Sequence, residues 1–255
     1  MLSSNTRWLH RATVAVSLIL GAVLWEIVGQ RTSAAFMAPL SATVRSLVDM
    51  LESGLLLRQI VSSLSLFFTG FGLAILVGMP LGLLFARIRS LRVALESYIM
   101  VLYATPTVAL VPFILSIFGF GFWPKVLVVF LFAIFPILYN TVEGGRSIKP
   151  ELIEVAHSFR SGEGALWRDV MIPFTLPFTM TGIRQAIGRG LVGMVVAEFF
   201  LSSSGLGQLI MMSSQNFDTA GMFAAILIIT LLGVTLMDLG RALENRFAVW
   251  RGYNR

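Results

Sequence analysis

Residues 64–86 read LSLFFTGFGLAILVGMPLGLLFA, and this stretch indicates the class of fold because it contains no charged residue. It is long enough to cross a membrane, since a helical span needs about 20 mostly apolar residues. Gly70, Gly78 and Pro80 lie inside it, but membrane helices tolerate Gly and Pro because neighbouring groups satisfy the freed backbone. The stretch therefore predicts a membrane-spanning helix.

The composition extends this prediction to the whole chain. Of the 255 residues, 56% are hydrophobic and 13% are charged, against about 25% charged residues in soluble domains. A soluble protein of this composition would expose large apolar patches and aggregate. The chain has no cysteine, which excludes disulfides, thiolate metal sites and a cysteine nucleophile.

Further apolar stretches predict an all-α, polytopic membrane protein with six transmembrane helices. The fourth apolar run, residues 126–139, is short and is expected to extend to Val142. The predicted spans cover residues 12–29, 64–86, 99–118, 126–142, 179–201 and 222–239.

The distribution of Lys and Arg predicts that both termini are cytoplasmic. With that orientation, thirteen of these residues lie in inside segments and four in outside segments, while Arg184 and Arg189 lie in the fifth span. Cytoplasmic loops carry such an excess. The net charge of +6 therefore indicates loops that face a cytoplasm, and no nucleic-acid partner is expected.

Residues 1–60 are expected to form a tail, the first span and an external amphipathic helix. A cleaved signal peptide is the alternative for the first span, but its apolar run is long for one. Val44, Leu47 and Leu51 then recur at helical spacing after a candidate cap at Ser41. This helix is expected to lie on the bundle or on the membrane surface.

The longest inside loop, residues 143–178, carries the most functional information. Pro150 suits the first turn of a helix, on which Val155 and Phe159 share one face. Gly162 and Gly164 are expected to break that helix before a second short one. Such a helix-turn-helix is suited to docking in a partner's groove, although an amphipathic loop at the membrane interface is the alternative.

This loop resembles the EAA loop of ABC-importer permeases, the binding-protein-dependent transport inner membrane components. The pattern is Glu-x-Ala, a Gly four residues later and a closing Pro, and Glu154, Ala156 and Pro173 fall on those positions. Arg160 replaces the Gly, and since Gly permits a tight turn, we expect the turn to shift to the next two residues. The resemblance implies a coupling loop formed by Glu154, Ala156, Phe159, Arg160, Ser161, Gly162 and Pro173.

Other motifs extend the resemblance over about residues 40–251 and are similar to the sulfonate, taurine and nitrate branch. Leu66 departs from it, because many members carry Arg there. The motifs are PTVALVP (106–112), FGFG (118–121), FPILYNT (135–141), RSIKPELI (146–153), AE (197–198) and SSGLG (203–207).

The resemblance implies a type I ABC importer transmembrane fold in residues 61–245, followed by a cytoplasmic tail in residues 246–255. It implies a bacterial inner (plasma) membrane protein, a homodimer that works with cytoplasmic ATPases and an external solute-binding protein. The chain has no Gly-x-x-x-x-Gly-Lys-Ser/Thr loop, so ATP must be bound by another chain and no cofactor is expected here. The expected cargo is a small anion such as a sulfonate, taurine or nitrate. A vitamin precursor, riboflavin or an aromatic acid is the alternative.

The fifth span combines small residues at four-residue spacing with charges. Small residues let helices approach closely, so packing is one interpretation and lining of the pathway is the other. Charges in a span are costly unless they are paired or face water. The pathway candidates are Arg184, Arg189, Gly190, Gly193 and Glu198.

Two other classes are less consistent with the sequence. A membrane-embedded enzyme would need a cluster of His, Asp or Ser within the spans, and the sequence offers none. A secondary transporter would use inverted repeats and midplane ion sites, but no internal repetition is obvious. His10 and His157 are too far apart in the sequence, and too lacking in companion ligands, to indicate a metal site.

Overall fold

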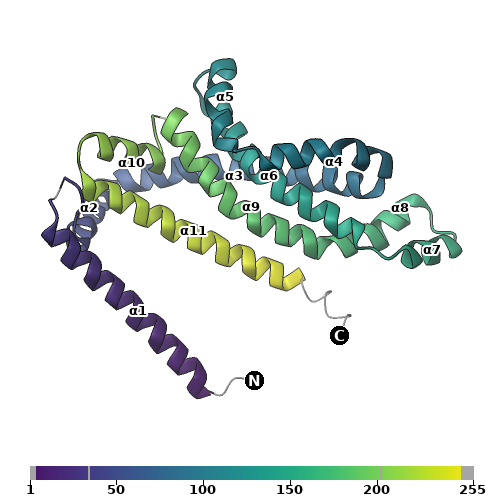
Figure 1. Ribbon diagram of the computed structural model, residues 1–255, viewed down its shortest axis with the longest axis horizontal. Coiled ribbons are helices and arrows are strands. Elements are labelled where there is room, and N and C mark those ends of the chain that lie inside the picture. Colours follow the sequence, from purple (N-terminus) through teal and green to yellow (C-terminus); the bar gives the residue numbers. More distant parts are fainter. Residues whose placement is uncertain (1–3, 34, 202, 248–255) are drawn as a thin grey trace.

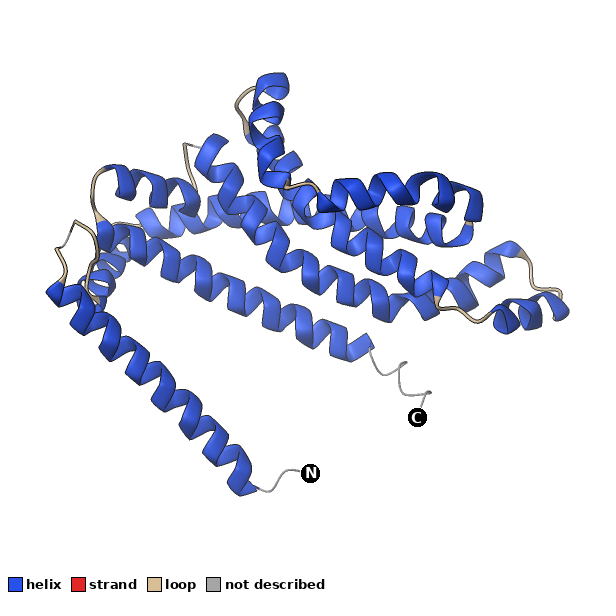
Figure 2. Ribbon diagram, viewed as in Figure 1, coloured by secondary structure: helices blue, strands red, loops and turns tan. Residues whose placement is uncertain are grey.

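The computed structural model describes residues 4–33, 35–201 and 203–247. Every regular element in this part of the chain is helical (Figure 2), which confirms the all-α prediction. The predicted tail, residues 246–255, lies outside the described residues from residue 248 onward. The elements are α1 (Ser4–Arg31), α2 (Leu40–Glu52), α3 (Leu55–Arg87), α4 (Arg89–Ala104), η1 (Thr107–Leu110), α5 (Val111–Phe118), α6 (Phe122–Arg146), α7 (Pro150–Ser158), α8 (Glu163–Leu166), η2 (Trp167–Met171), α9 (Ile172–Leu201), α10 (Leu206–Gln215) and α11 (Thr219–Phe247).

Four of the described helices are long and apolar enough to cross a membrane. They are the Ala12–Arg31 part of α1, all of α3 and α6, and the Thr219–Arg246 part of α11. Helix α9 corresponds to the fifth predicted span and has 30 residues, and its charged residues Arg184, Arg189 and Glu198 lie within the predicted span.

The third predicted span, residues 99–118, is not one helix. Helix α4 ends at Ala104, and the chain is extended at Thr105 (φ −68°, ψ 130°) before the 3₁₀ turn η1 and helix α5 begin. The cause is Pro106, which has no N–H to donate and keeps the preceding residue out of the helical region. Pro112 lies in the first turn of α5, where proline is tolerated.

The centre of the bundle is helix α6, which packs against both α3 and α9. Close approach is possible because the facing positions are small: a Cβ on Gly182 of α9 would lie 2.7 Å from the carbonyl oxygen of Pro136 in α6. Helix α11 runs beside α9, and it also contacts α2 and α10 (Figure 1). The bundle is therefore elongated, with α7 and α8 at one end and α2 and α10 at the other.

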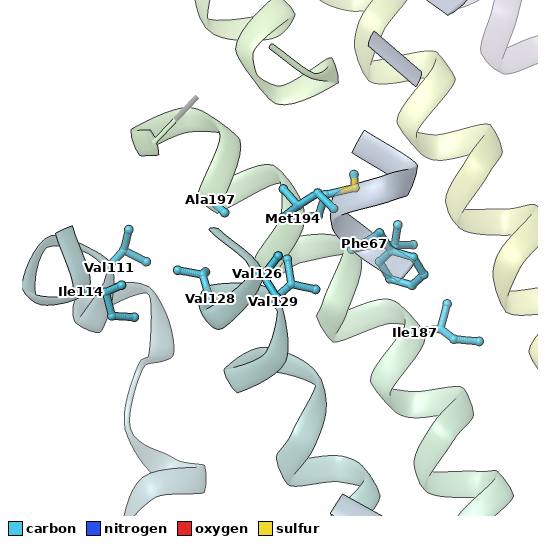
Figure 3. Close-up of a cluster of buried hydrophobic side chains, with 11 residues drawn as sticks. Phe67, Val111, Ile114, Val126, Val128, Val129, Ile187, Met194 and Ala197 are labelled. Atoms are coloured by element: carbon cyan, nitrogen blue, oxygen red, sulfur yellow. The ribbon is translucent and has the colours of Figure 1, made fainter. Parts of the chain in front are cut away.

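An apolar core joins the broken third segment to the bundle (Figure 3). Val111 and Ile114 of α5 are buried in the same cluster as Val128 of α6, Met194 of α9 and Phe67 of α3. Figure 1 shows α5 projecting sideways from the bundle axis. Only the inner face of this short helix is therefore packed, and its outer face is exposed.

Helix α1 leaves the bundle at an angle and is fixed only near its C-terminal end (Figure 1). The Glu26 carboxylate accepts hydrogen bonds from the Ser41 backbone N–H (2.9 Å) and hydroxyl (2.8 Å) at the start of α2. The prediction of a helix in this region is confirmed, but the predicted cap at Ser41 is wrong: Pro39 is the N-cap residue, and the bonds of Ser41 go to Glu26 instead.

Candidate functional site

The end of the bundle that carries α7 and α8 forms a compact helix-turn-helix, which we call the knuckle (residues 150–173). Pro150 opens α7 as predicted. Gly162 is the N-cap residue of α8, whereas Gly164 lies inside α8 and breaks nothing. Helix α8, the π-helical turn η2 and α9 follow one another without a gap. The knuckle is thus joined to a long bundle helix by continuous helical structure.

The turn after α7 is made by Arg160, not by the residues that follow it. Arg160 has φ +54°, the left-handed conformation that usually favours glycine. Its N–H donates to the His157 carbonyl (2.8 Å), and the Ser161 N–H donates to the Ala156 carbonyl (3.0 Å). This pair of bonds is a Schellman motif. The predicted shift of the turn to Ser161 and Gly162 is therefore wrong, since Gly162 has an extended backbone (φ −69°, ψ 164°).

Pro173 also differs from its predicted role. It lies in the first turn of α9 and does not close the segment. Because proline has no N–H, the Asp169 carbonyl loses its usual donor four residues on. The helix accommodates this with a π turn, in which the Ile172 N–H bonds to the Trp167 carbonyl.

The knuckle has an inner and an outer face. On the inner face Ala156 packs against a small core of Ile148, Leu166 and Met171. On the outer face, by contrast, Val155 is 52% exposed and Phe159 is 81% exposed. Leu152 and the side chain of Glu154 are exposed as well. The result is an apolar surface with a charged edge, supported from behind by its own core.

An ion pair fixes the knuckle to the bundle. Arg87 at the C-terminal end of α3 lies 2.8 Å from Glu163 of α8, measured from Nη2 to Oε1. Both side chains are partly exposed, so the pair adds little to stability; apolar packing of Ala86 against the core that contains Leu166 accompanies it.

In α9, Arg184 has a partner that the sequence did not reveal. Its Nε lies 2.6 Å from Oε2 of Glu244 in α11, and the Thr181 hydroxyl donates to the other carboxylate oxygen of Glu244 (2.7 Å). Glu244 was not singled out because it lies near the end of the last helix, where a charge suggests only a solvated terminus. The pair ties α9 to α11.

Gly190 and Gly193 lie inside the bundle. A Cβ on Gly190 would be 3.1 Å from the ring of Phe67, and one on Gly193 would be 2.8 Å from Cβ of Phe132. These positions are small because α3 and α6 pack against them. Their geometry fits the packing interpretation that the sequence left open.

Glu198 is also buried, with 1% of its surface exposed. Its carboxylate accepts hydrogen bonds from the Ser63 hydroxyl (2.7 Å) and from the Gly207 backbone N–H (2.7 Å). Ser63 in turn accepts a bond from the Leu206 N–H (2.8 Å). Glu198 therefore joins α9, α3 and the start of α10, and this clamp consists of Glu198, Ser63 and residues 205–207.

Arg189 differs from these residues, since it is exposed on the face of α9 that the rest of the bundle leaves open. Gln185 and Val192 are exposed on the same face. The Asn140 side chain of α6 donates a hydrogen bond to the Gln185 amide oxygen (3.3 Å). We call these three residues, Gln185, Arg189 and Val192, the α9 stripe, and Arg189 is its one member among the predicted pathway candidates.

A bundle of apolar helices with a projecting helix-turn-helix ahead of its fifth predicted span agrees with the class that the sequence motifs indicated, the membrane subunits of ATP-driven importers. Residues 78–249 match the family model of the binding-protein-dependent transport system inner membrane component. The chain belongs to this family, and it is the permease subunit of an ABC importer.

Curated relatives support this assignment along nearly the whole chain. The riboflavin transport system permease protein RibX of Chloroflexus aurantiacus is 37% identical, over 92% of this chain and 88% of RibX. The putative aliphatic sulfonates transport permease protein SsuC of Bacillus subtilis is 30% identical, over 92% and 87%. The taurine transport system permease protein TauC of Escherichia coli is 26% identical, over 96% and 93%.

A solved structure supports the fold. The chain is similar to an inward-facing form of the MetNI methionine ABC transporter, with a TM-score of 0.64 and 17% identity, over 76% of this chain and 96% of that chain. The type I importer fold predicted from the sequence is thereby confirmed. The chain is embedded in the membrane and works with ATPase subunits and a binding protein, as its family does.

Proposed function

We propose that two copies of this chain form the translocation pathway for a small organic or inorganic anion, such as a sulfonate, taurine or nitrate. The cargo would arrive on an external solute-binding protein. Among the relatives, SsuC and TauC are named for aliphatic sulfonates and taurine. The observation that carries the proposal is the exposed Arg189 within α9.

An exposed arginine in a membrane helix needs a polar environment, because a charge facing lipid near the bilayer centre is costly. The opposite side of α9 is occupied by α3 and α6, which cover Gly190 and Gly193. We therefore place the stripe Gln185–Arg189–Val192 toward a water-filled pathway at a two-fold interface. Such closed dimers are the commonest homo-oligomers.

Two cytoplasmic ATPases would bind the outer face of the knuckle and would carry out ATP hydrolysis, which this chain does not perform. Phe159 and Val155 would insert into a cleft on the ATPase. The orientation in the bacterial inner membrane, with both termini cytoplasmic, rests on the excess of Lys and Arg in the inside segments. A reporter that is active only outside the cytoplasm, fused to the C-terminus, would give strong signal if this orientation were wrong.

The cargo proposal is tested with Arg189→Gln in the importer reconstituted with its ATPase and binding protein. We expect ATP-driven uptake of the labelled anion to fall about tenfold, the effect of losing roughly 1.4 kcal/mol of attraction. Arg189→Lys is the matched control, since it keeps the charge. Normal uptake by the Gln variant contradicts the proposal, and loss of assembly indicates a structural ion pair instead.

A second cargo class has one specific observation in its favour. RibX, which is named for riboflavin transport, is 37% identical to this chain. If riboflavin or another uncharged cargo is carried, its uptake should be unaffected by Arg189→Gln. Measuring uptake of nitrate, taurine and riboflavin side by side, in the wild type and this variant, separates the two classes.

A further inference from the structure

The break between α4 and α5 lies inside a stretch that the sequence marks as membrane-spanning. Residues 99–118 contain no charged side chain, yet the helix is interrupted at Thr105 and Pro106. Irregular backbone at membrane depth is found only where protein buries it or where it lines a water-filled cavity, because lipid cannot satisfy its polar groups.

The described donors at this break turn back to one acceptor. The Thr105 N–H and hydroxyl both donate to the Val101 carbonyl (2.9 and 2.8 Å). Pro106 has no N–H to offer. The C-terminal end of an α-helix leaves several carbonyls without intrahelical donors. Helix α4 ends in this way within an apolar segment.

The chain itself does not cover the break. Pro106 and Ala109 are exposed, and Val108 is 44% exposed. Only the next turn is buried, where Val111 and Ile114 hold α5 against the bundle. The exposed side of the break therefore meets lipid, a second protein surface or water.

A cavity lies one turn away along α4, on the side of the bundle that carries the knuckle. It is a small, partly open cleft between α3, α4 and α6. Its floor is apolar, and Glu143 and Arg146, which are paired at 2.9 Å, line it as well. Its lining residues are Phe85, Ile99, Met100, Leu138, Tyr139, Val142, Glu143 and Arg146.

We infer that the break at residues 105–109 lines the water-filled translocation pathway, with its backbone carbonyls and the Thr105–Thr107 segment facing the cargo route. This inference rests on the proposed importer function and names a second pathway-lining element beside α9. Water and a hydrated cargo would satisfy the backbone groups that lipid cannot. The break then places exposed backbone polar groups within an otherwise apolar membrane span.

The chain has no cysteine, so single substitutions give clean probes. Val108→Cys and Ala109→Cys place a thiol on the exposed side of the break. Val128→Cys is the matched buried control, since Val128 is 0% exposed, and Ser53→Cys in the exposed α2–α3 turn is the water-exposed control. The assembled transporter in proteoliposomes is treated on both sides with a small charged methanethiosulfonate, with and without ATP.

We expect both probes at the break to react roughly tenfold or more faster than Val128→Cys in at least one nucleotide state, because a thiol ionises in water and not in an apolar interior. Labelling as slow as that of Val128→Cys in every state, in assembled protein, overturns the inference. Uptake and ATP hydrolysis by the same preparations test the importer function separately. Ala109→Cys adds a single sulfur atom at an exposed position, so assembly is expected to survive.

Discussion

Arg160 makes the turn of the knuckle at an energetic cost. A left-handed backbone costs an L-residue with a side chain about 1 kcal/mol or more, and Arg160 adopts it (φ +54°) while Ser161 completes the Schellman bonds. The turn therefore depends on the bonds around it and not on the conformational freedom of the residue at its centre.

Replacing Arg160 with glycine should consequently stabilise the knuckle. We expect the amide of Ser161 to exchange with solvent about fivefold more slowly in Arg160→Gly, because relief of about 1 kcal/mol changes the opening equilibrium by that factor. Arg160→Val should exchange faster than the wild type, since a β-branched residue tolerates this conformation least. Equal exchange in all three proteins would show that the backbone here is not strained.

Gly207 provides a second test at the level of one residue. A Cβ there would lie 2.8 Å from Cβ of Glu198 and 2.9 Å from the Val195 carbonyl. We expect Gly207→Ala to destabilise the protein by about 1–3 kcal/mol through overpacking, seen as faster thermal inactivation in detergent. The control is Gly72→Ala, where an added Cβ meets nothing within 4 Å. Equal lifetimes for the two variants would mean that Glu198 does not hold the start of α10.

Sequence reasoning located residues of this clamp without linking them. Glu198 and the SSGLG motif at 203–207 were both singled out, but Ser63 was not. The link requires that Ser63 meet Glu198, 135 positions away, and Leu206, 143 positions away, and no local pattern reports such a contact. Arg160 was recognised as a departure from the family's Gly, yet the turn was placed one residue too late. The backbone hydrogen bonds that place the turn are seen in the structure and not in the sequence.

Individual elements were predicted well where apolar periodicity is long and uninterrupted. Helices α3, α6 and α11 contain their predicted spans. The third span failed because composition alone counted residues 99–118 as one apolar run, whereas Pro106 divides it. Proline was treated as tolerable in a membrane helix. That holds for Pro80 and Pro136, which lie inside helices, but not for Pro106.

The contact between α9 and α11 is open to a direct test. Arg184 and Glu244 form an ion pair at 2.6 Å, with Glu244 largely buried. We expect Arg184→Gln and Glu244→Gln each to shorten the thermal lifetime, and the double variant to lose less than the sum, with a coupling of about 1 kcal/mol. Strictly additive losses would mean that the pair contributes nothing to helix packing.

Two structural connections join the knuckle to the bundle. Helical structure continues from Glu163 to Leu201, and the pair Arg87–Glu163 adds a second connection to α3. The sequence predicted the knuckle and its docking role. It did not reveal that Ala156 packs inward on Leu166 while Phe159 faces outward, because Ala156 in α7 and Phe159 at its C-cap are only three positions apart and differ in what packs against them.

We propose that the outer face of α7 couples this permease to its ATPase, and co-purification of the ATPase with the Phe159→Asp variant is the measurement that decides it. Phe159 is 81% exposed and its backbone N–H bonds to a backbone carbonyl. Replacing its side chain should therefore leave membrane insertion and folding unchanged. Phe217→Asp is the matched control, since Phe217 is 75% exposed near α10 at the opposite end of the bundle and its left-handed backbone (φ +56°) accepts Asp. Ala156→Asp should also fail, but by disrupting the inner core of the knuckle.

We predict that Phe159→Asp retains roughly thirtyfold less ATPase than the wild type at matched concentrations, as expected for the loss of an aromatic anchor worth about 2 kcal/mol. Phe217→Asp should retain the wild-type amount. Wild-type ATPase binding and wild-type uptake by Phe159→Asp would contradict the account, because the ATPase would then be attached somewhere other than the knuckle.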